Sequence, residues 1–249
     1  FSATHNLTYG VPQGSVLSPV LYNLYIYDLP KTKCELALFA DDTAIFTSSK
    51  LVKPIEKKLS SDINTLNKYY NKWKITINND KTQAIFFSNR KYKQLPVNPI
   101  VTKFGNINFK PEVRYLGVLF NNKLKFNLHI AKQIEKVDNI FKLLYPLLNR
   151  RSSLDSKIKI NIYKLYLRPI LLYASSVFID SPPSILKAIQ IKQNKILKSM
   201  LGLPWYTRTS IIHCIANISL IHEQMLKLDL NLKDKTRNSN NPIISSLYN

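Results

Sequence analysis

The stretch ELALFADDTAIFTS, residues 35–48, sets two carboxylates side by side between two runs of apolar and β-favouring residues. The pattern predicts two short strands, residues 36–40 and 43–47, with Asp41 and Asp42 at the tip of a hairpin. An exposed turn accepts this pair readily, because Asp is a common turn residue. In a cleft, two adjacent negative charges instead require a cation, and oxygen ligands suit Mg²⁺. The rest of the sequence decides between a plain turn and half of a metal site.

The chain as a whole is strongly basic, with a formal net charge of +21 over 249 residues. Such an excess predicts attraction to a polyanion, and nucleic acid is the commonest one. Residues 1–50 hold three lysines against four carboxylates, whereas basic residues recur every few positions from 53 to 198. This distribution indicates an acidic spot within a long basic groove. The alternative is a basic surface that is only solvated.

Composition also bounds the class of protein. The length suits one large domain or two small ones with a proper core. Two cysteines give no disulfide framework and indicate a reducing, intracellular compartment, the nucleus or the cytoplasm, with no secretion signal visible. No apolar run reaches the roughly 18 residues of a membrane span, so no membrane partner is expected. Because the chain opens on Phe1, we expect a piece of a longer protein.

The order of elements around the hairpin predicts a mixed α+β fold. Before it, a loop with Gly10 and Gly14 leads to a helix that Ser18 caps and Pro19 begins. After it, apolar residues at spacings of three and four predict an amphipathic helix from about Pro54 to Trp73. Residues 73–88 read as two strands around an Asn-Asn-Asp-Lys turn, and residues 113–120 as one buried strand. A glycine-proline loop such as 10–14 is either a plain connection or a binding element.

From Phe126 onward the pattern changes to long helices. At ~100° per residue, one face of residues 185–200 carries Ile185, Ile189, Ile196 and Met200, and the other carries lysines. The proline pair at 182–183 breaks the chain just before this helix. The last residues, 233–249, are polar and rich in turn formers, which predicts a flexible tail.

Four motifs in this order resemble the palm of reverse transcriptases, and in detail those of jockey-type, LINE-like non-LTR retrotransposons. They are GVPQGSVLSPVLYNLYIYDLP (10–30), LFADDTAIF (38–46), NNDKTQAIFFS (78–88) and YLGVLF (115–120). The helical remainder, including LRPILLYASSVF (167–178) and residues 201–208, resembles the thumb and the region beyond it. The resemblance implies a partial palm over 1–120, a helical thumb over 121–180, a helical C-terminal region over 181–232 and a flexible tail over 233–249.

The resemblance also implies roles for residues at the hairpin and before it. Asp41 and Asp42 would be catalytic carboxylates that hold Mg²⁺ or Mn²⁺, with Asp41 the direct ligand and Asp42 at the edge. The template and the incoming nucleotide would meet Pro12, Gln13, Gly14, Phe39 and Ala40. For Phe39, a plain core aromatic is the alternative. The family's first catalytic aspartate lies on a strand upstream of the Pro-Gln-Gly loop, which here would precede Phe1, and Asp28 does not replace it.

Further along the chain the resemblance implies a proton donor and two nucleic-acid contacts. Lys81 is a candidate general acid for the pyrophosphate leaving group; a phosphate contact or a solvated turn lysine are the alternatives. The primer grip would comprise Tyr115, Leu116 and Gly117, although Gly117 also fits a plain β-bulge. The backbone of the template-primer duplex would meet four lysines of the basic helix face, Lys187, Lys192, Lys195 and Lys198.

Three functions compete on this sequence. The first is an RNA-directed DNA polymerase fragment that takes an RNA template, a DNA primer or RNA–DNA duplex, and deoxynucleoside triphosphates. It would be inactive alone, because the first aspartate, the fingers and the endonuclease are missing. The second is a non-enzymatic nucleic-acid-binding relic, which would bind a duplex without metal. The third, a two-metal nuclease, does not explain the Pro-Gln-Gly and Tyr-Leu-Gly motifs. A zinc site at His213, Cys214 and His222 lacks a second cysteine, so a helix face is the better interpretation.

Overall fold

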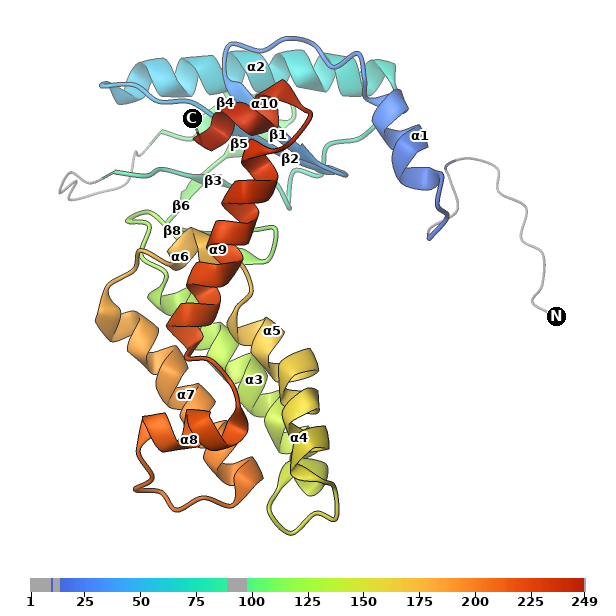
Figure 1. Cartoon of the computed structure of the whole chain (residues 1–249). Helices are drawn as coiled ribbons and strands as arrows, with labels where there is room; N and C mark the ends of the chain where they lie inside the picture. The colour runs from blue at the N-terminus through green and yellow to red at the C-terminus, as the bar shows by residue number, and fades with distance from the viewer. Residues whose placement is uncertain (1–9, 11–13, 89–97, 249) are drawn as a thin grey trace. The chain divides into compact units, whose positions relative to one another are not determined.

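The computed structural model describes residues 10, 14–88 and 98–248 (Figure 1). It contains two compact units, Phe1–Val113 and Arg114–Asn249, which are described separately below. Helices alternate with small sheets, and each sheet found among the described residues has two strands. The expected α+β class is therefore confirmed.

The quoted stretch forms the hairpin that its pattern predicts. Strand β1 (Glu35–Phe39) pairs antiparallel with β2 (Asp42–Phe46), and the register sets Phe39 opposite Asp42. Only Ala40 and Asp41 remain for the turn. Because opposite residues of an antiparallel pair share a face, Leu36, Leu38, Thr43 and Ile45 lie on one side of the hairpin, and Phe39 and Asp42 lie on the other.

Two helices of the first unit flank this hairpin in the sequence. Helix α1 (Ser18–Tyr25) has Leu17 at its N-cap position without a side-chain cap, so Ser18 is the first helical residue and the expectation that it caps the helix is wrong. Pro19 lies in the first turn, where its missing N–H costs no hydrogen bond. Helix α2 (Val52–Lys72) confirms the predicted amphipathic helix and begins two residues before Pro54.

The remaining strands of the first unit are short. They are β3 (Ala84–Ile85), which pairs parallel with β6 (Phe109–Lys110), and β4 (Ile100–Thr102), which pairs antiparallel with β5 (Gly105–Ile107). The strand expected before the Asn-Asn-Asp-Lys turn does not form. Lys74 has a φ of +57°, outside the β region, and residues 75–77 have no ladder partner among the described residues.

The core of the first unit lies between α2, the hairpin and these short strands. Ile55 and Leu59 from α2 are buried with Cys34, Ile100 and Ile107. Burial is the main cause that raises the pKa of the Cys34 thiol to about 11. The α2 carboxylate of Asp62 is only 3% exposed, and it accepts a hydrogen bond of 2.7 Å from the backbone N–H of Cys34. This bond ties the start of the hairpin to the middle of α2.

The second unit begins within a hairpin that the sequence did not predict. Residues 113–120 form two strands, β7 (Glu112–Tyr115) and β8 (Val118–Asn121), in place of the single strand expected. Leu116 and Gly117 make the turn between them, with φ values of +45° and +80°. Positive φ at both turn residues is what two-residue hairpins of type I′ require.

Helices make up the rest of the second unit, as predicted. A long helix α3 (Asn127–Leu148) and a basic helix α7 (Pro183–Leu201) contact each other, and α9 (Ile221–Arg237) packs on α6 (Ser175–Phe178) and α7. The remaining segments are α4 (Ser156–Ile162), the π-helical η1 (Tyr163–Leu167), α5 (Arg168–Leu171), α6 (Ser175–Phe178), α8 (Thr209–Ala216), α9 (Ile221–Arg237), α10 (Pro242–Ser245) and η2 (Ser246–Tyr248).

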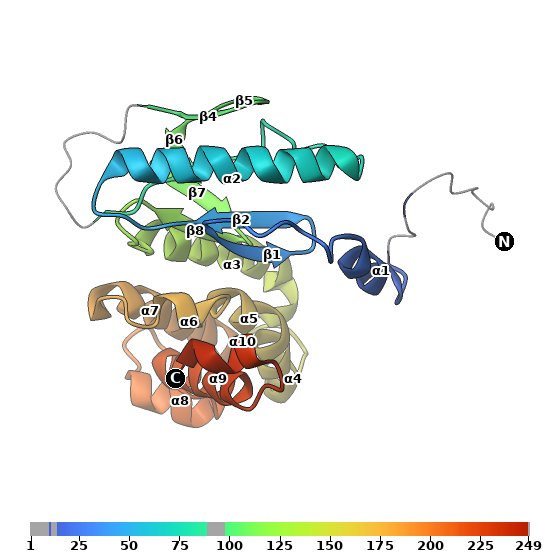
Figure 2. The same ribbon diagram turned by 90° about the horizontal axis from the view of Figure 1, so that it is seen from above.

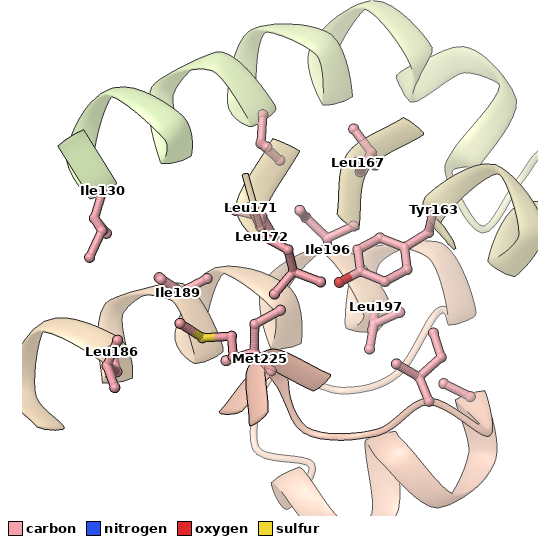
Figure 3. Close-up of a cluster of buried hydrophobic side chains, with 14 of the residues drawn as sticks. Ile130, Tyr163, Leu167, Leu171, Leu172, Leu186, Ile189, Ile196, Leu197 and Met225 are labelled. Atoms are coloured by element: carbon pink, nitrogen blue, oxygen red, sulfur yellow. The ribbon is translucent and has the colours of Figure 1, made fainter. Parts of the chain in front are cut away.

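The predicted apolar face of α7 forms much of the second core. Ile189, Ile196 and Met200 are each 1% exposed, and Ile185 packs at the edge. Figure 3 shows Ile189 and Ile196 beside Met225 of α9 and Tyr163 of η1. Burial of such side chains contributes about 1.5–3 kcal/mol each, so this cluster dominates the stability of the unit.

The C-terminal residues, for which we expect a flexible tail, include helical segments. Helix α9 continues to Arg237, and α10 and η2 follow with their own hydrogen bonds. The side chain of Asn241 caps α10, which explains why this polar stretch is helical. Within the described ranges, no helix is both long enough and apolar enough to cross a membrane.

We expect Asp62→Ala to destabilise the first unit by about 1–3 kcal/mol, because it leaves the buried N–H of Cys34 without its acceptor. The measurement is urea unfolding at pH 7, followed by the fluorescence of Trp73 in a Trp205→Phe background. The exposed Asp80→Ala is the matched control and should change the unfolding free energy by less than about 0.5 kcal/mol. Equal effects of the two substitutions would contradict this role for Asp62.

Candidate functional site

The two carboxylates lie at the turn of the first hairpin. Asp41 is the second turn residue and Asp42 opens β2, and both are exposed. Ala40 holds a φ of +49°, a conformation that costs an ordinary residue about 1–2 kcal/mol. Phe39 is 63% exposed on the same face as Asp42, so it is not a core aromatic in this unit. Strained backbone of this kind concentrates at functional sites.

The opposite face of the hairpin is fixed to α2. The hydroxyl groups of Thr43 and Tyr70 are hydrogen-bonded at 3.1 Å, and Ile45 packs against the core below. These contacts come from the strand that carries Asp42. They hold the turn from one side and leave the side with the carboxylates open.

Helix α1 lies near the β1–β2 hairpin (Figure 2). The pKa of the Tyr22 hydroxyl is raised first by burial, then by Tyr70 and by the negative charge of Asp41. This electrostatic coupling places Tyr22 of α1 near the hairpin turn. Gly14, at the start of the segment, is exposed and has a φ of +87°, so its backbone is open to approach. Pro12 and Gln13 lie outside the described residues.

Asp28 has a structural partner at the end of the same segment. The Tyr69 hydroxyl donates a 2.6 Å hydrogen bond to the Asp28 carboxylate, and burial together with this bond raises the pKa of Tyr69. Tyr25 also donates to the backbone carbonyl of Trp73, and the two rings meet edge to face. These contacts dock α1 on the C-terminal end of α2, which positions it beside the hairpin.

The donor set at the turn suits a hard cation, because carboxylate oxygens are the ligands that Mg²⁺ prefers. Within the described residues, no group of three or more His, Cys, Asp or Glu side chains gathers as a metal site. His213 is buried in α8 with both ring nitrogens hydrogen-bonded, one to the carbonyl of Ile218 and the other to the Gln190 and Asn194 side chains. His213 therefore has the role of a packed helix residue.

Lys81 lies on an exposed turn after α2. Its backbone N–H donates to the Asn78 side chain at 3.1 Å, and Thr82 donates twice to the carbonyl of Asn78. The Asn-Asn-Asp-Lys turn predicted from the sequence is confirmed. These bonds fix the backbone of the turn and leave the ammonium group exposed.

The Leu116–Gly117 turn belongs to the second unit and has a partner that the sequence did not indicate. The Tyr173 hydroxyl donates a 2.6 Å hydrogen bond to the Leu116 carbonyl. A methyl group on Gly117 would lie 3.0 Å from that hydroxyl oxygen, so glycine is needed both for space and for its positive φ. Gly117 is thus a turn residue and not a bulge. Tyr173 lies 57 residues after Leu116, and no local pattern links the two.

The four predicted lysines of α7 differ in their surroundings. Lys192 forms an ion pair with Asp138 of α3, and burial lowers its pKa. Lys198 donates to the backbone carbonyl of Trp205, whereas Lys187 and Lys195 are exposed. The helix therefore carries its charge on a stripe that includes Lys187, Lys195 and Lys198.

A family model described as reverse transcriptase (RNA-dependent DNA polymerase) matches residues 2–120. These residues include the hairpin, α1, α2 and the Leu116–Gly117 turn. The match ends where the helical part of the second unit begins. No solved structure gives a significant match to the chain.

Curated relatives extend the likeness over the helical part. A probable RNA-directed DNA polymerase from transposon X-element of Drosophila melanogaster is 29% identical over 99% of this chain and 27% of its own length. The RNA-directed DNA polymerase from mobile element jockey of the same species is 33% identical over 80% of this chain and 22% of its own length. A probable RNA-directed DNA polymerase from transposon BS of Drosophila melanogaster is 29% identical over 92% of this chain and 26% of its own length. The chain thus spans only about a quarter of these relatives.

We expect Tyr173→Phe to lower the unfolding free energy of the second unit by about 0.5–1.5 kcal/mol through loss of the hydrogen bond to Leu116. Gly117→Ala should lower the same unfolding free energy by about 1–2 kcal/mol or more, because alanine is strained at this positive φ and its methyl group crowds the Tyr173 hydroxyl. Urea unfolding followed by far-UV circular dichroism measures both, with the exposed Tyr166→Phe as the control. A Tyr173→Phe variant as stable as that control would refute the anchoring role.

Proposed function

The chain belongs to the reverse transcriptase family of jockey-type non-LTR retrotransposons, and from this premise we propose that it is part of an RNA-directed DNA polymerase. The observation that carries the proposal is the hairpin turn, where two carboxylates follow a strained Ala40 and the charge of Asp41 acts on Tyr22 of α1. The activity proposed is nucleotide transfer to the 3′ hydroxyl of a primer.

Asp41 and Asp42 would hold the divalent metal, Mg²⁺ or Mn²⁺, with Asp41 as the direct ligand and Asp42 at the edge of the site. When bound, the metal lowers the pKa of the primer hydroxyl and offsets the charge that develops during phosphoryl transfer. The chain's own contribution is to hold two exposed carboxylates in a fixed position. The hydrogen bond between Thr43 and Tyr70 and the strained turn supply that position.

Residues near the turn would position the nucleic acid. The exposed Phe39 ring would pack beneath the primer end, and Ala40 would contact the nucleotide. Pro12, Gln13 and Gly14 would line the place of the templating base and the incoming deoxynucleoside triphosphate. The open backbone at Gly14 supports this role.

Other residues would act on the leaving group and the primer. Lys81, exposed on its turn, would donate a proton to the leaving pyrophosphate. Tyr115, Leu116 and Gly117 would grip the primer backbone through the turn that Tyr173 anchors. The assignment of residues 1–120 to the palm, 121–180 to the thumb and 181–232 to a C-terminal region stays a proposal.

The basic stripe of α7 would contact the phosphates of a template–primer duplex. Lys187 and Lys195 are the exposed members, whereas Lys192 is paired with Asp138. Phosphate contacts of this kind carry no sequence information but strengthen binding at low salt. An RNA template with a DNA primer, or the RNA–DNA duplex, is therefore the partner proposed.

The full activity would need more of the protein than this chain. The family uses a third carboxylate, which would come from the larger part of the relatives that the chain does not span. By itself the chain should be inactive in synthesis. The fingers and an endonuclease would likewise be supplied by the longer protein, which would act inside the cell, in the nucleus or the cytoplasm.

We expect Asp41→Asn, in a protein extended to the length of the relatives, to reduce primer extension on an RNA template by about a thousandfold, because it removes a metal ligand worth several kcal/mol. The matched control is Asp80→Asn, an exposed acid on a turn of the same unit, which should retain activity. If Asp41→Asn extends primers at the rate of the control, the proposed site is wrong.

The same extended protein separates the polymerase from a nucleic-acid-binding relic. A polymerase incorporates nucleotides only with Mg²⁺ or Mn²⁺, and addition of EDTA stops the incorporation. A relic binds an RNA–DNA duplex equally well with and without the metal and incorporates nothing. The second result would replace the polymerase proposal with the non-enzymatic one.

We expect Lys81→Ala in the extended protein to lower the single-turnover rate about 100-fold, as loss of a general acid does. Lys57→Ala, which removes an exposed lysine of α2, is the control. An unchanged single-turnover rate would reduce Lys81 to a solvated turn residue.

A further inference from the structure

The second unit contains an open pocket that is basic and aromatic. Its volume is about 1020 Å³, larger than most small-molecule sites. The residues that line it, all within the described part of the chain, include four cations and no carboxylate. We call it the basic pocket, and the residues that matter here are Tyr145, Arg150, Arg151, Lys195, Lys198 and Trp205. It lies outside the segment that the reverse transcriptase model matches.

One wall of the basic pocket is the loop that follows α3. The amine of Lys159 is 3% exposed, and it donates to the backbone carbonyls of Asn149 at 2.8 Å and Ser152 at 3.3 Å. The Asn149 side chain accepts from the backbone N–H of Arg151 at 2.7 Å and donates to the Tyr145 carbonyl at 2.9 Å. A buried cation thus fixes the loop that presents the two arginines.

The other wall is the end of α7 and the loop behind it. Gly202 ends the helix with a φ of +67°, and a methyl group there would lie 3.1 Å from Cβ of Arg150. Lys198 donates to the carbonyl of Trp205, and its own carbonyl accepts from Leu203 at 3.0 Å. The two walls therefore meet closely at Gly202, and the loop that carries Trp205 is held to the helix.

Trp205 is presented to solvent by this arrangement. Its side chain is 85% exposed, and Tyr206, which meets it edge to face, is 71% exposed. Exposing a large aromatic side chain to water is unfavourable, and tryptophan and tyrosine are enriched at binding surfaces. Trp205 lines the same pocket as four cations, a combination that suits a nucleotide better than a purely apolar partner.

We propose that the basic pocket binds single-stranded nucleic acid, with an unpaired base stacked on Trp205 and the adjoining phosphates held by its four cations. Aromatic platforms inside a positive groove are the means by which proteins hold unpaired strands. A duplex offers phosphates to the four cations, but its bases are stacked inside the helix and none can stack on Trp205. The proposal does not depend on Asp41 and Asp42.

The test uses the 249-residue chain and fluorescein-labelled 12-nucleotide probes: oligouridylate, oligothymidylate and a duplex of the same length. Fluorescence anisotropy at about 0.1 M salt gives the affinities. Trp205→Ala should weaken both single strands about tenfold, the effect typical of one lost base stack, and should leave the duplex nearly unchanged. Trp205→Tyr keeps a ring for stacking and should retain most of the affinity. Tyr166→Ala, also an exposed aromatic, is the control.

The charge of the pocket is tested separately. Arg150→Ala should reduce the slope of log affinity against log salt for a single strand by about 0.7. Lys235→Ala removes the same charge from an exposed position on α9 and should leave that slope closer to the wild-type value. Equal circular dichroism spectra and melting temperatures establish that the variants are folded.

Oligouridylate and oligothymidylate show whether the pocket binds RNA, DNA or both. Preference for oligouridylate means that the site reads RNA, and equal binding means that it accepts either strand through base and phosphate alone; both support the proposal. It is overturned if Trp205→Ala binds single strands as tightly as Tyr166→Ala does. It is also overturned if an oligoglutamate peptide displaces a single strand at equal concentration, because the pocket would then attract anions in general.

Discussion

The register between β1 and β2 is the constraint on which the candidate site depends. Because Phe39 pairs with Asp42, only Ala40 and Asp41 remain for the turn, and Ala40 must adopt a positive φ. A shift of one residue would exchange the two faces of the hairpin, so Ile45 would leave the core and Asp42 would enter it. Packing of Ile45 and the bond between Thr43 and Tyr70 prevent that shift. The stability of the first unit therefore fixes where its two carboxylates lie.

Sequence patterns predicted the elements whose signals are local. The alternation around the Asp pair gave the hairpin to within one residue, and the spacing of apolar residues gave α2 and the buried face of α7. The patterns failed at residues 113–120, where they predicted one strand instead of two. Leu116 adopts a positive φ that leucine rarely takes, and Gly117 is the one typical turn residue at this turn. They also predicted a strand at 75–77, where the residues favour strands but have no ladder partner in the described part of the chain.

Contacts between distant residues account for what the sequence could not reveal. Tyr173 anchors the Leu116–Gly117 turn, and the buried Lys159 fixes the loop of Arg150 and Arg151. Each depends on tertiary packing, so neither has a motif. Conversely, the four motifs that resemble reverse transcriptases were recognisable because that chemistry requires particular residues in a fixed order. Candidate catalytic residues of the first unit can therefore be recognised from the sequence, whereas the contacts that shape the second unit are visible only in its three-dimensional structure.

The central claim is that the turn at Asp41 and Asp42 holds the metal of a polymerase. Iron-mediated cleavage tests it most directly, because Fe²⁺ bound in place of Mg²⁺ generates radicals that cut the backbone beside the metal. The extended protein, with an RNA template and a DNA primer bound, should be cut within residues 39–43, and excess Mg²⁺ should suppress the cut. Cleavage at other positions only, or a cut at this turn that persists in Asp41→Asn, would contradict the claim.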